Sequence, residues 1–204
     1  MGGQEDIEDM LAFQQGNEEG FHRLFQRYSK PIINYLYRFT WDRSVAEDLT
    51  QEVFLRICRA AKTYEPKTSF RTWLYTIATN VARNEFRRQE HTVRHESLSA
   101  PLYEDRMIHQ EDRMDPTAET PEGMAIGRQL EEHIQRALSM LPERQRTALL
   151  LCRHHTFSYQ EVADIMNLRV GAVKSLIHRA TETLRRELAP YLDTAAEERG
   201  THAM

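Results

Sequence analysis

The residues of this chain best suited to chemistry are hydrogen-bond donors gathered between positions 169 and 181, a stretch without a single acid. Their three- and four-residue spacing would place them on one side of a helix. They are Lys174, Ser175, His178 and Arg179. Donors on an exposed helix can contact base edges or phosphates in the major groove of DNA. The pattern therefore indicates nucleic-acid recognition, with an ordinary solvated helix face as the alternative.

A second group combines cations with aromatic rings. Bases outnumber acids between residues 62 and 94, and the same stretch contains Tyr64, Phe70 and Trp73. An unstacked single strand offers phosphates to cations and base faces to rings, so this mixture suits single-stranded DNA. Trp73 also shares helical spacing with Phe70 and Ile77, which is equally well explained by a place in the core.

A third group is acidic. Asp48, Gln51, Glu52 and Leu55 surround a stripe of Leu49, Val53 and Ile57 that we expect to face the core. They would form a hydrogen-bonding surface with one apolar anchor, as protein interfaces often have. A solvated helix face is again the alternative.

Catalytic or metal-binding groups are poorly represented. The candidate metal ligands are His91 with His95, and Cys152 with His154 and His155. Neither set has the four-ligand spacing of a zinc site, and no phosphate loop or nucleophile elbow occurs. We therefore predict no enzymatic activity, no catalytic residue, no metal and no cofactor.

Charge is segregated along the chain, whose formal net charge is −4. Acids without bases fill residues 1–19, and acids dominate residues 96–122. Segregation leaves the basic stretch able to bind phosphates despite the negative total. No apolar run approaches the roughly 20 residues that span a bilayer, and the start does not resemble a secretory signal. We expect a cytoplasmic protein without membrane insertion.

The supporting elements are all predicted to be helices. Apolar residues at three- and four-residue steps indicate a four-helix domain over residues 13–92. We expect one helix around Phe21–Tyr28, a second with Pro31 in its first turn, a third capped by Ser44 and a fourth from about Ser69 to Arg88.

Residues 93–127 are predicted to be a flexible acidic linker, because periodicity fails there and several prolines interrupt it. Helical order resumes in a second domain, residues 128–190. There Ser158 and Glu161 form a capping box that starts a short helix, residues 167–169 make a turn, and a second helix begins at Val170. This pattern predicts a helix-turn-helix.

Three segments have distinctive sequences: residues 46–55 read AEDLTQEVFL, residues 70–80 read FRTWLYTIATN and residues 141–146 read LPERQR. In this order they resemble segments of the extracytoplasmic-function (ECF) group of the sigma-70 family. The similarity covers nearly the whole chain, from Phe13 to Leu188.

The resemblance implies an all-α protein whose region 2 domain and region 4 domain are joined by the linker. It implies a sigma factor that binds core RNA polymerase, directs it to promoters, helps to melt them and is controlled by an anti-sigma factor. Core polymerase would be bound by Asp48, Gln51, Glu52 and Leu55. The downstream promoter element would be contacted by Tyr64, Lys67, Arg71, Asn80, Arg83, Asn84 and Arg87. The upstream element would be contacted by Arg169, Lys174, Ser175, His178 and Arg179, with Arg153 a further candidate for phosphates.

The chain departs from the family at Lys174 and Leu176, where arginine is frequent, which weakens bidentate readout of guanine there. A repressor-type dimer using the same helix-turn-helix is the alternative function. It would need a self-complementary surface to space two recognition helices. Because the sequence has no heptad run for such a surface, we expect no homo-oligomer.

Overall fold

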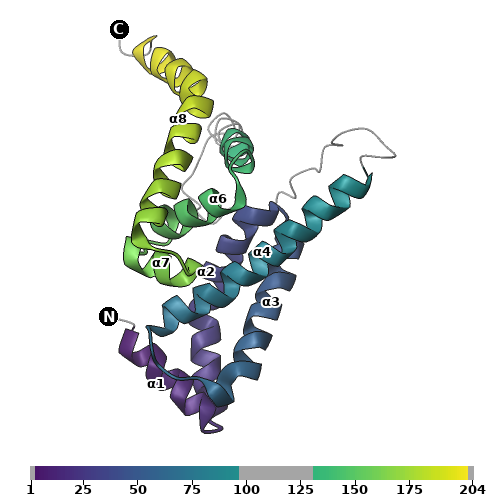
Figure 1. Cartoon of the computed structure of the whole chain (residues 1–204), viewed down its shortest axis with the longest axis vertical. Coiled ribbons are helices and arrows are strands. Elements are labelled where there is room, and N and C mark those ends of the chain that lie inside the picture. Colours follow the sequence, from purple (N-terminus) through teal and green to yellow (C-terminus); the bar gives the residue numbers. More distant parts are fainter. Residues whose placement is uncertain (1–2, 97–130, 202–204) are drawn as a thin grey trace. The chain divides into compact units, whose positions relative to one another are not determined.

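The computed structural model describes residues 3–96 and 131–201, and every regular element within those ranges is helical, which confirms the predicted all-α class (Figure 1). Two compact units are present. The first contains α1 to α4. The second contains α6 and α8, and α7 lies between these two in the chain. Residues 97–127 of the predicted linker lie outside the described ranges. Within those ranges, no helix is long and apolar enough to cross a membrane.

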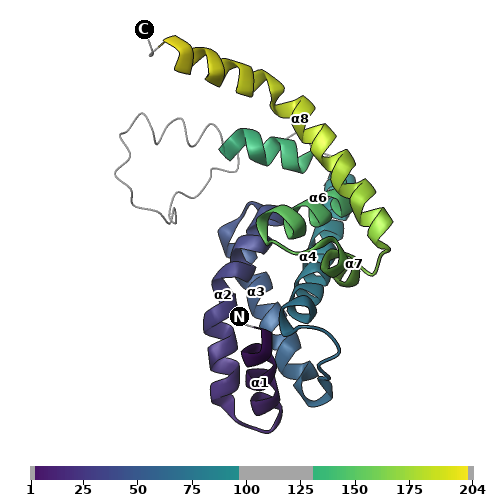
Figure 2. The same ribbon diagram turned by 90° about the vertical axis from the view of Figure 1, so that its left-hand side faces the viewer.

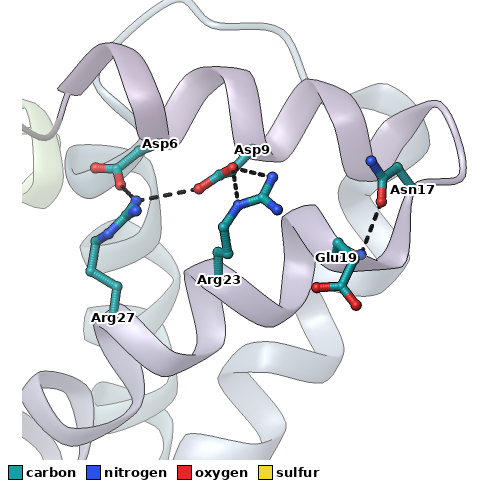
Figure 3. Close-up of polar contacts among 6 residues, drawn as sticks. All are labelled: Asp6, Asp9, Asn17, Glu19, Arg23 and Arg27. Atoms are coloured by element: carbon teal, nitrogen blue, oxygen red, sulfur yellow. Dashed lines mark hydrogen bonds and ion pairs between the residues drawn. The ribbon is translucent and has the colours of Figure 1, made fainter.

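The first two helices form a hairpin whose first arm the sequence analysis missed. α1 (Gly3–Gln14) ends before Gly16, whose φ of 94° lies in the left-handed region that glycine tolerates. α2 (Glu18–Thr40) begins after Asn17, whose side-chain oxygen accepts a hydrogen bond from Glu19 N at 3.1 Å (Figure 3). The domain boundary that we placed at residue 13 falls inside α1.

Pro31 lies inside α2, so the prediction of separate helices on its two sides is wrong. A proline inside a helix removes one backbone hydrogen bond. The buried face of α2 nevertheless runs past it without interruption, through Tyr28, Ile32 and Tyr35. A single helix keeps all of these side chains in the core, and that burial outweighs the lost bond.

The third helix, α3 (Arg43–Ala60), begins after Asp42 and not after Ser44. The Asp42 carboxylate accepts a hydrogen bond from Val45 N at 3.1 Å. Because α2 ends at Thr40 and Trp41 is its C-cap, Asp42 is the first residue able to cap the next helix. Ser44 is exposed in the first turn.

A short 3-10 turn, η1 (Ala61–Thr63), follows α3, and a loop then leads to α4 (Phe70–Glu96). Ser69 Oγ accepts a hydrogen bond from Thr72 N at 3.1 Å, so Ser69 caps α4 close to the predicted start. α4 continues beyond the predicted end at Arg88 and beyond the linker boundary at residue 93.

α2, α3 and α4 lie side by side and share the core of the first unit (Figures 1 and 2). Their fully buried side chains include Ile32, Leu36, Val53, Ile57 and Leu74. A buried hydrogen bond joins α2 to α4 across this core, between the Tyr35 hydroxyl and Thr79 Oγ1 at 2.9 Å. These three helices form the support for the surfaces of α3 and α4 described below.

The second unit combines a helix at residues 131–139 with α6 (Glu143–Leu149), the π-helical turn η2 (Leu150–His154) and α8 (Val170–Thr201). Predicted core positions such as Ala137, Leu141 and Ala148 are buried. Arg146 is only 3% exposed and donates to the Ser139 carbonyl oxygen at 3.0 Å, which ties α6 to the helix before it.

Candidate nucleic-acid interface

The predicted capping box is present at the start of α7 (Tyr159–Met166). Glu161 N donates to Ser158 Oγ at 3.2 Å, and the Glu161 carboxylate accepts from Ser158 N at 2.8 Å. These reciprocal bonds satisfy two N–H groups that a helix start leaves without partners. They fix where α7 begins.

The turn after α7 is equally well defined. Asn167 has a φ of 51°, and the N–H of Leu168 bonds the Ala163 carbonyl oxygen at 2.9 Å. This pattern ends a helix in the left-handed conformation that asparagine tolerates. α8 starts at Val170, so the predicted helix-turn-helix segments are confirmed.

The donor face of α8 is exposed. Lys174, Ser175, His178 and Arg179 all lie in solvent and together line a shallow depression of about 360 Å³. Arg169 is exposed just before the helix, as is Arg153 in η2. The structure thus brings four of the five predicted upstream residues onto one surface and places the fifth at the start of that helix.

Two of these donors already have partners inside α8. Ser175 Oγ donates to the Gly171 carbonyl oxygen at 3.0 Å, and His178 Nδ1 lies 3.3 Å from the Glu182 carboxylate. Within the described part of the chain, neither Lys174 nor Arg179 forms an ion pair. These two cations are therefore the groups most available to an anionic ligand.

A second surface runs along α4. Asn80, Arg83, Asn84 and Arg87 recur at three- and four-residue steps, and each is exposed or half-buried. Trp73 lies two turns before Asn80 on the same side and is half-buried. Its ring packs against those of Tyr64 and Phe70, with centres 4.8 and 5.8 Å away, so Trp73 both joins the core and lies partly exposed in line with the polar and basic stripe.

Arg71 does not belong to that stripe. It precedes Asn80 by nine residues, or about two and a half turns, and so lies on the opposite side of α4. Its guanidinium carbon lies 5.9 Å from the centre of the Tyr75 ring, within the range of a cation–π contact.

The loop before α4 differs from expectation at Tyr64. Tyr64 is 5% exposed, and its ring centre lies 4.8 Å from that of Trp73 and 6.4 Å from that of Phe70. Its ring face is therefore covered by the protein and is not presented to a base. Lys67 is fully in solvent, and its ion pair with Glu65 at 2.7 Å raises the pKa of the lysine.

A third surface lies on α3. Asp48, Gln51, Glu52 and Leu55 are spaced three and four residues apart and share one face, and Leu55 is 50% exposed. Arg56 pairs with Glu52 at 2.7 Å, and this hydrogen bond lowers the pKa of Glu52. The face is thus an ionised, hydrogen-bonding surface beside one exposed apolar side chain.

The metal-ligand candidates gain no support. Among the described residues, no group of three possible ligands lies together. His91 and His95 are in the last turns of α4 and His154 is in η2, and the positions of these side chains lie outside the described part of the structure.

Two family models match the chain: sigma-70 region 2 over residues 24–92, and sigma-70 region 4 over residues 131–184. The RNA polymerase sigma-H factor of Pseudomonas aeruginosa is 31% identical over 192 residues, which cover 94% of this chain and 98% of that protein. The chain belongs to the sigma-70 family. This sigma factor is also 31% identical, over 88% of its length and 93% of the relative's, to the ECF RNA polymerase sigma-E factor of Haemophilus influenzae. It is therefore a member of the ECF group.

Two solved structures share the fold of this sigma factor. CnrH, in complex with the cytosolic domain of CnrY, has a TM-score of 0.66 at 20% identity, covering 91% of this chain and 98% of that one. The sigma factor RpoE, in complex with the anti-sigma factor NepR from Bartonella quintana, has a TM-score of 0.62 at 23% identity, covering 83% and 96%. Sigma factors act in transcription initiation and are not enzymes, which agrees with the absence of catalytic motifs.

Proposed function

We propose that this ECF sigma factor divides its work among the three surfaces described above. The α3 face binds core RNA polymerase. The α4 stripe, with the loop before it, opens the downstream promoter element, and the donor face of α8 reads the upstream element. The observation that carries the proposal is that each surface is exposed while the opposite face of its helix is buried.

The α3 face supports polymerase binding through Asp48, Gln51, Glu52 and Leu55. An exposed apolar anchor beside ionised groups suits a protein partner, because the anchor contributes affinity and the charges contribute orientation. Since Arg56 already engages Glu52, Asp48 is the acid best placed to meet a basic partner.

On α4, the stripe of Asn80, Arg83, Asn84 and Arg87 supports a role along a melted strand, with Trp73 at its end. Lys67, in the loop, adds an exposed cation. Melting costs a few kcal/mol per unstacked base, so polymerase must supply binding energy alongside these contacts. Tyr64 then acts indirectly, by packing against Trp73 and Phe70 at the start of the loop. Arg71 would contact the downstream element from the side of α4 opposite the stripe.

On α8, Lys174 and Arg179 are the principal contacts to the duplex, with Ser175, His178 and Arg169 as further donors. Arginine can bond guanine through two parallel hydrogen bonds, whereas lysine acts as a single charged donor. We therefore assign base readout mainly to Arg179.

Regulation by an anti-sigma factor is part of the proposal. Two structures of this fold are complexes, one of them with an anti-sigma factor by name. A protein that binds the same exposed faces would block both polymerase and DNA. We also propose that this sigma factor acts in the cytoplasm, where bacterial transcription occurs.

The test is run-off transcription with purified core polymerase. Promoter fragments are first selected from genomic DNA by the reconstituted holoenzyme, and each is then transcribed with and without this protein. Transcripts that require both the protein and the selected promoter support the proposal. Tight duplex binding by the protein alone, with no transcript, would support a repressor instead.

A further inference from the structure

Gln14, the last residue of α1, contacts a segment almost fifty positions away. Its side-chain nitrogen lies 3.0 Å from the carbonyl oxygen of Ala61, 3.3 Å from that of Lys62 and 3.1 Å from that of Tyr64. Ala61 and Lys62 belong to η1 and Tyr64 directly follows it, at the end of a helical stretch where carbonyl oxygens can accept hydrogen bonds from side chains. One carboxamide thus holds the chain at the start of the loop before α4.

α1 itself is firmly attached to α2 (Figure 3). Asp9 pairs with Arg23 at 2.7 Å, and Arg27 bonds both Asp6 and Asp9. Asp6 is 1% exposed, and such a buried carboxylate is stable only when its charge is paired. Gly20 of α2 lets the two helices approach so closely that a Cβ added there would lie 2.2 Å from the Asp9 carbonyl oxygen in α1. Gln14 therefore projects from a fixed support.

The loop is held at its far end by Ser69, which caps α4 through Thr72 N. Between the two attachments, residues 65–68 are all exposed. A short segment that is held at both ends has few conformations, so it loses little conformational entropy when its exposed residues bind a ligand.

We propose that Gln14 is a positioning residue for promoter opening, holding the start of the loop so that residues 65–68 meet single-stranded DNA in one geometry. This rests on the proposed function of the loop. Gln14 lies outside the matched region 2 model, which begins at residue 24.

The test compares variants that differ in donor capacity. Gln14→Met keeps the length of the side chain but cannot donate, and Gln14→Glu places a carboxylate against three carbonyl oxygens. Gln14→Lys retains donors and suits the end of a helix. Gln4→Met is the matched control, because Gln4 is exposed in the same helix and bonds only Glu8, at 3.3 Å, among the contacts described.

Two measurements are made on each full-length variant. Hydrogen–deuterium exchange reports how tightly residues 61–69 are held, independently of function. Fluorescence anisotropy of the reconstituted holoenzyme measures affinity for a single-stranded oligonucleotide that carries the non-template strand of a selected promoter. We expect Gln14→Met and Gln14→Glu to exchange roughly three- to tenfold faster in the loop and to lose affinity by a similar factor. Gln14→Lys and Gln4→Met should match the unmodified protein in both.

Unchanged exchange in Gln14→Met would overturn the inference, as would faster loop exchange with unchanged affinity for the oligonucleotide. Exchange that rises equally in α2 and α3 would show a general loss of stability and would also overturn it. If the unmodified holoenzyme does not bind the oligonucleotide, the proposed function of the loop is contradicted, and the exchange data show separately whether Gln14 holds it.

Discussion

At the scale of single residues, the donors of α8 differ in how freely they can meet DNA. His178 lies against Glu182, and Ser175 bonds its own helix backbone. Arg179 is exposed and forms no ion pair within the described residues. This difference makes Arg179 the sharpest single-residue test of upstream recognition.

We expect Arg179→Ala to weaken holoenzyme binding to a selected promoter by about 1 to 3 kcal/mol, the usual contribution of a good base contact. The control is Arg186→Ala, because Arg186 is an exposed arginine of the same helix that pairs with Glu187 at 3.1 Å. Gel-shift titration at fixed salt measures both. Equal, small losses in the two variants would mean that Arg179 contributes only charge.

Tyr75 gives a prediction about pH. Burial raises the pKa of Tyr75 to about 12 in the folded state, whereas an unfolded tyrosine has a pKa of about 10. The unfolded chain therefore loses this proton first, so stability is complete below about pH 10 and falls as pH rises toward 12. The fall due to this residue is at most about 1.4 kcal/mol per pH unit.

Urea unfolding between pH 9 and 12 checks this for the protein and for Tyr75→Phe. The phenylalanine variant should lose stability less steeply, because it has no hydroxyl proton to lose. Parallel curves for the two proteins would contradict the assigned shift.

The chemistry of several residues could be predicted from sequence, but their partners were harder to foresee. The capping box of Ser158 and Glu161 depends on local spacing and is confirmed. The pairing of His178 with Glu182 is also local, but it was not predicted, because Glu182 lies just beyond the acid-free stretch of residues 169–181. The burial of Tyr64 depends on packing against Trp73, which spacing along the chain does not reveal.

At the scale of elements, the hairpin of α1 and α2 depends on a close approach at Gly20. The Cβ of an alanine there would lie 2.2 Å from the Asp9 carbonyl oxygen, and a backbone atom cannot yield as a flexible side chain does. We expect Gly20→Ala to lower the free energy of unfolding by at least about 1 to 3 kcal/mol, measured by urea denaturation.

Gly171→Ala is the matched control for that prediction. Gly171 lies in α8 with nothing within 4 Å of an added Cβ, so alanine should raise stability by about 0.5 to 1 kcal/mol. Equal effects of the two substitutions would contradict the close packing of α1 on α2.

α3 supplies the second prediction at this scale. Leu55 is 50% exposed, so Leu55→Ala should leave the fold intact while removing the apolar anchor of the face that we propose binds polymerase. We expect a loss of about 1 to 2 kcal/mol in core polymerase affinity by biolayer interferometry. Met140→Ala, at an equally apolar position that is 58% exposed in the second unit, is the control. A similar affinity of both variants for core polymerase would show that Leu55 is not part of the interface.

The helices of the first unit show why boundaries are harder to predict than helices. Periodicity located α3 and α4 because their buried stripes are regular. It failed at Pro31, where continuous burial on both sides outweighs one lost hydrogen bond. It also missed α1, although Gly16 and Asn17 are standard signals for the end of one helix and the start of the next.

At the scale of the whole molecule, we propose that the two helical units carry complementary tasks. The first unit presents the α3 face and the α4 stripe, and the second presents the donor face of α8. The order of the segments along the chain was enough to predict this family, because each segment has a distinct composition. The contact of Gln14 with η1 was not foreseeable, since it joins positions far apart in the sequence.

We propose that this protein melts a promoter together with core polymerase. Permanganate footprinting on a selected duplex promoter detects this melting, because permanganate oxidises unpaired thymines. We predict reactive thymines near the transcription start only when the protein and core polymerase are both present, and fewer of them with Arg179→Ala. Protection of the duplex by the protein alone, with no reactive thymine in the presence of polymerase, would contradict the claim.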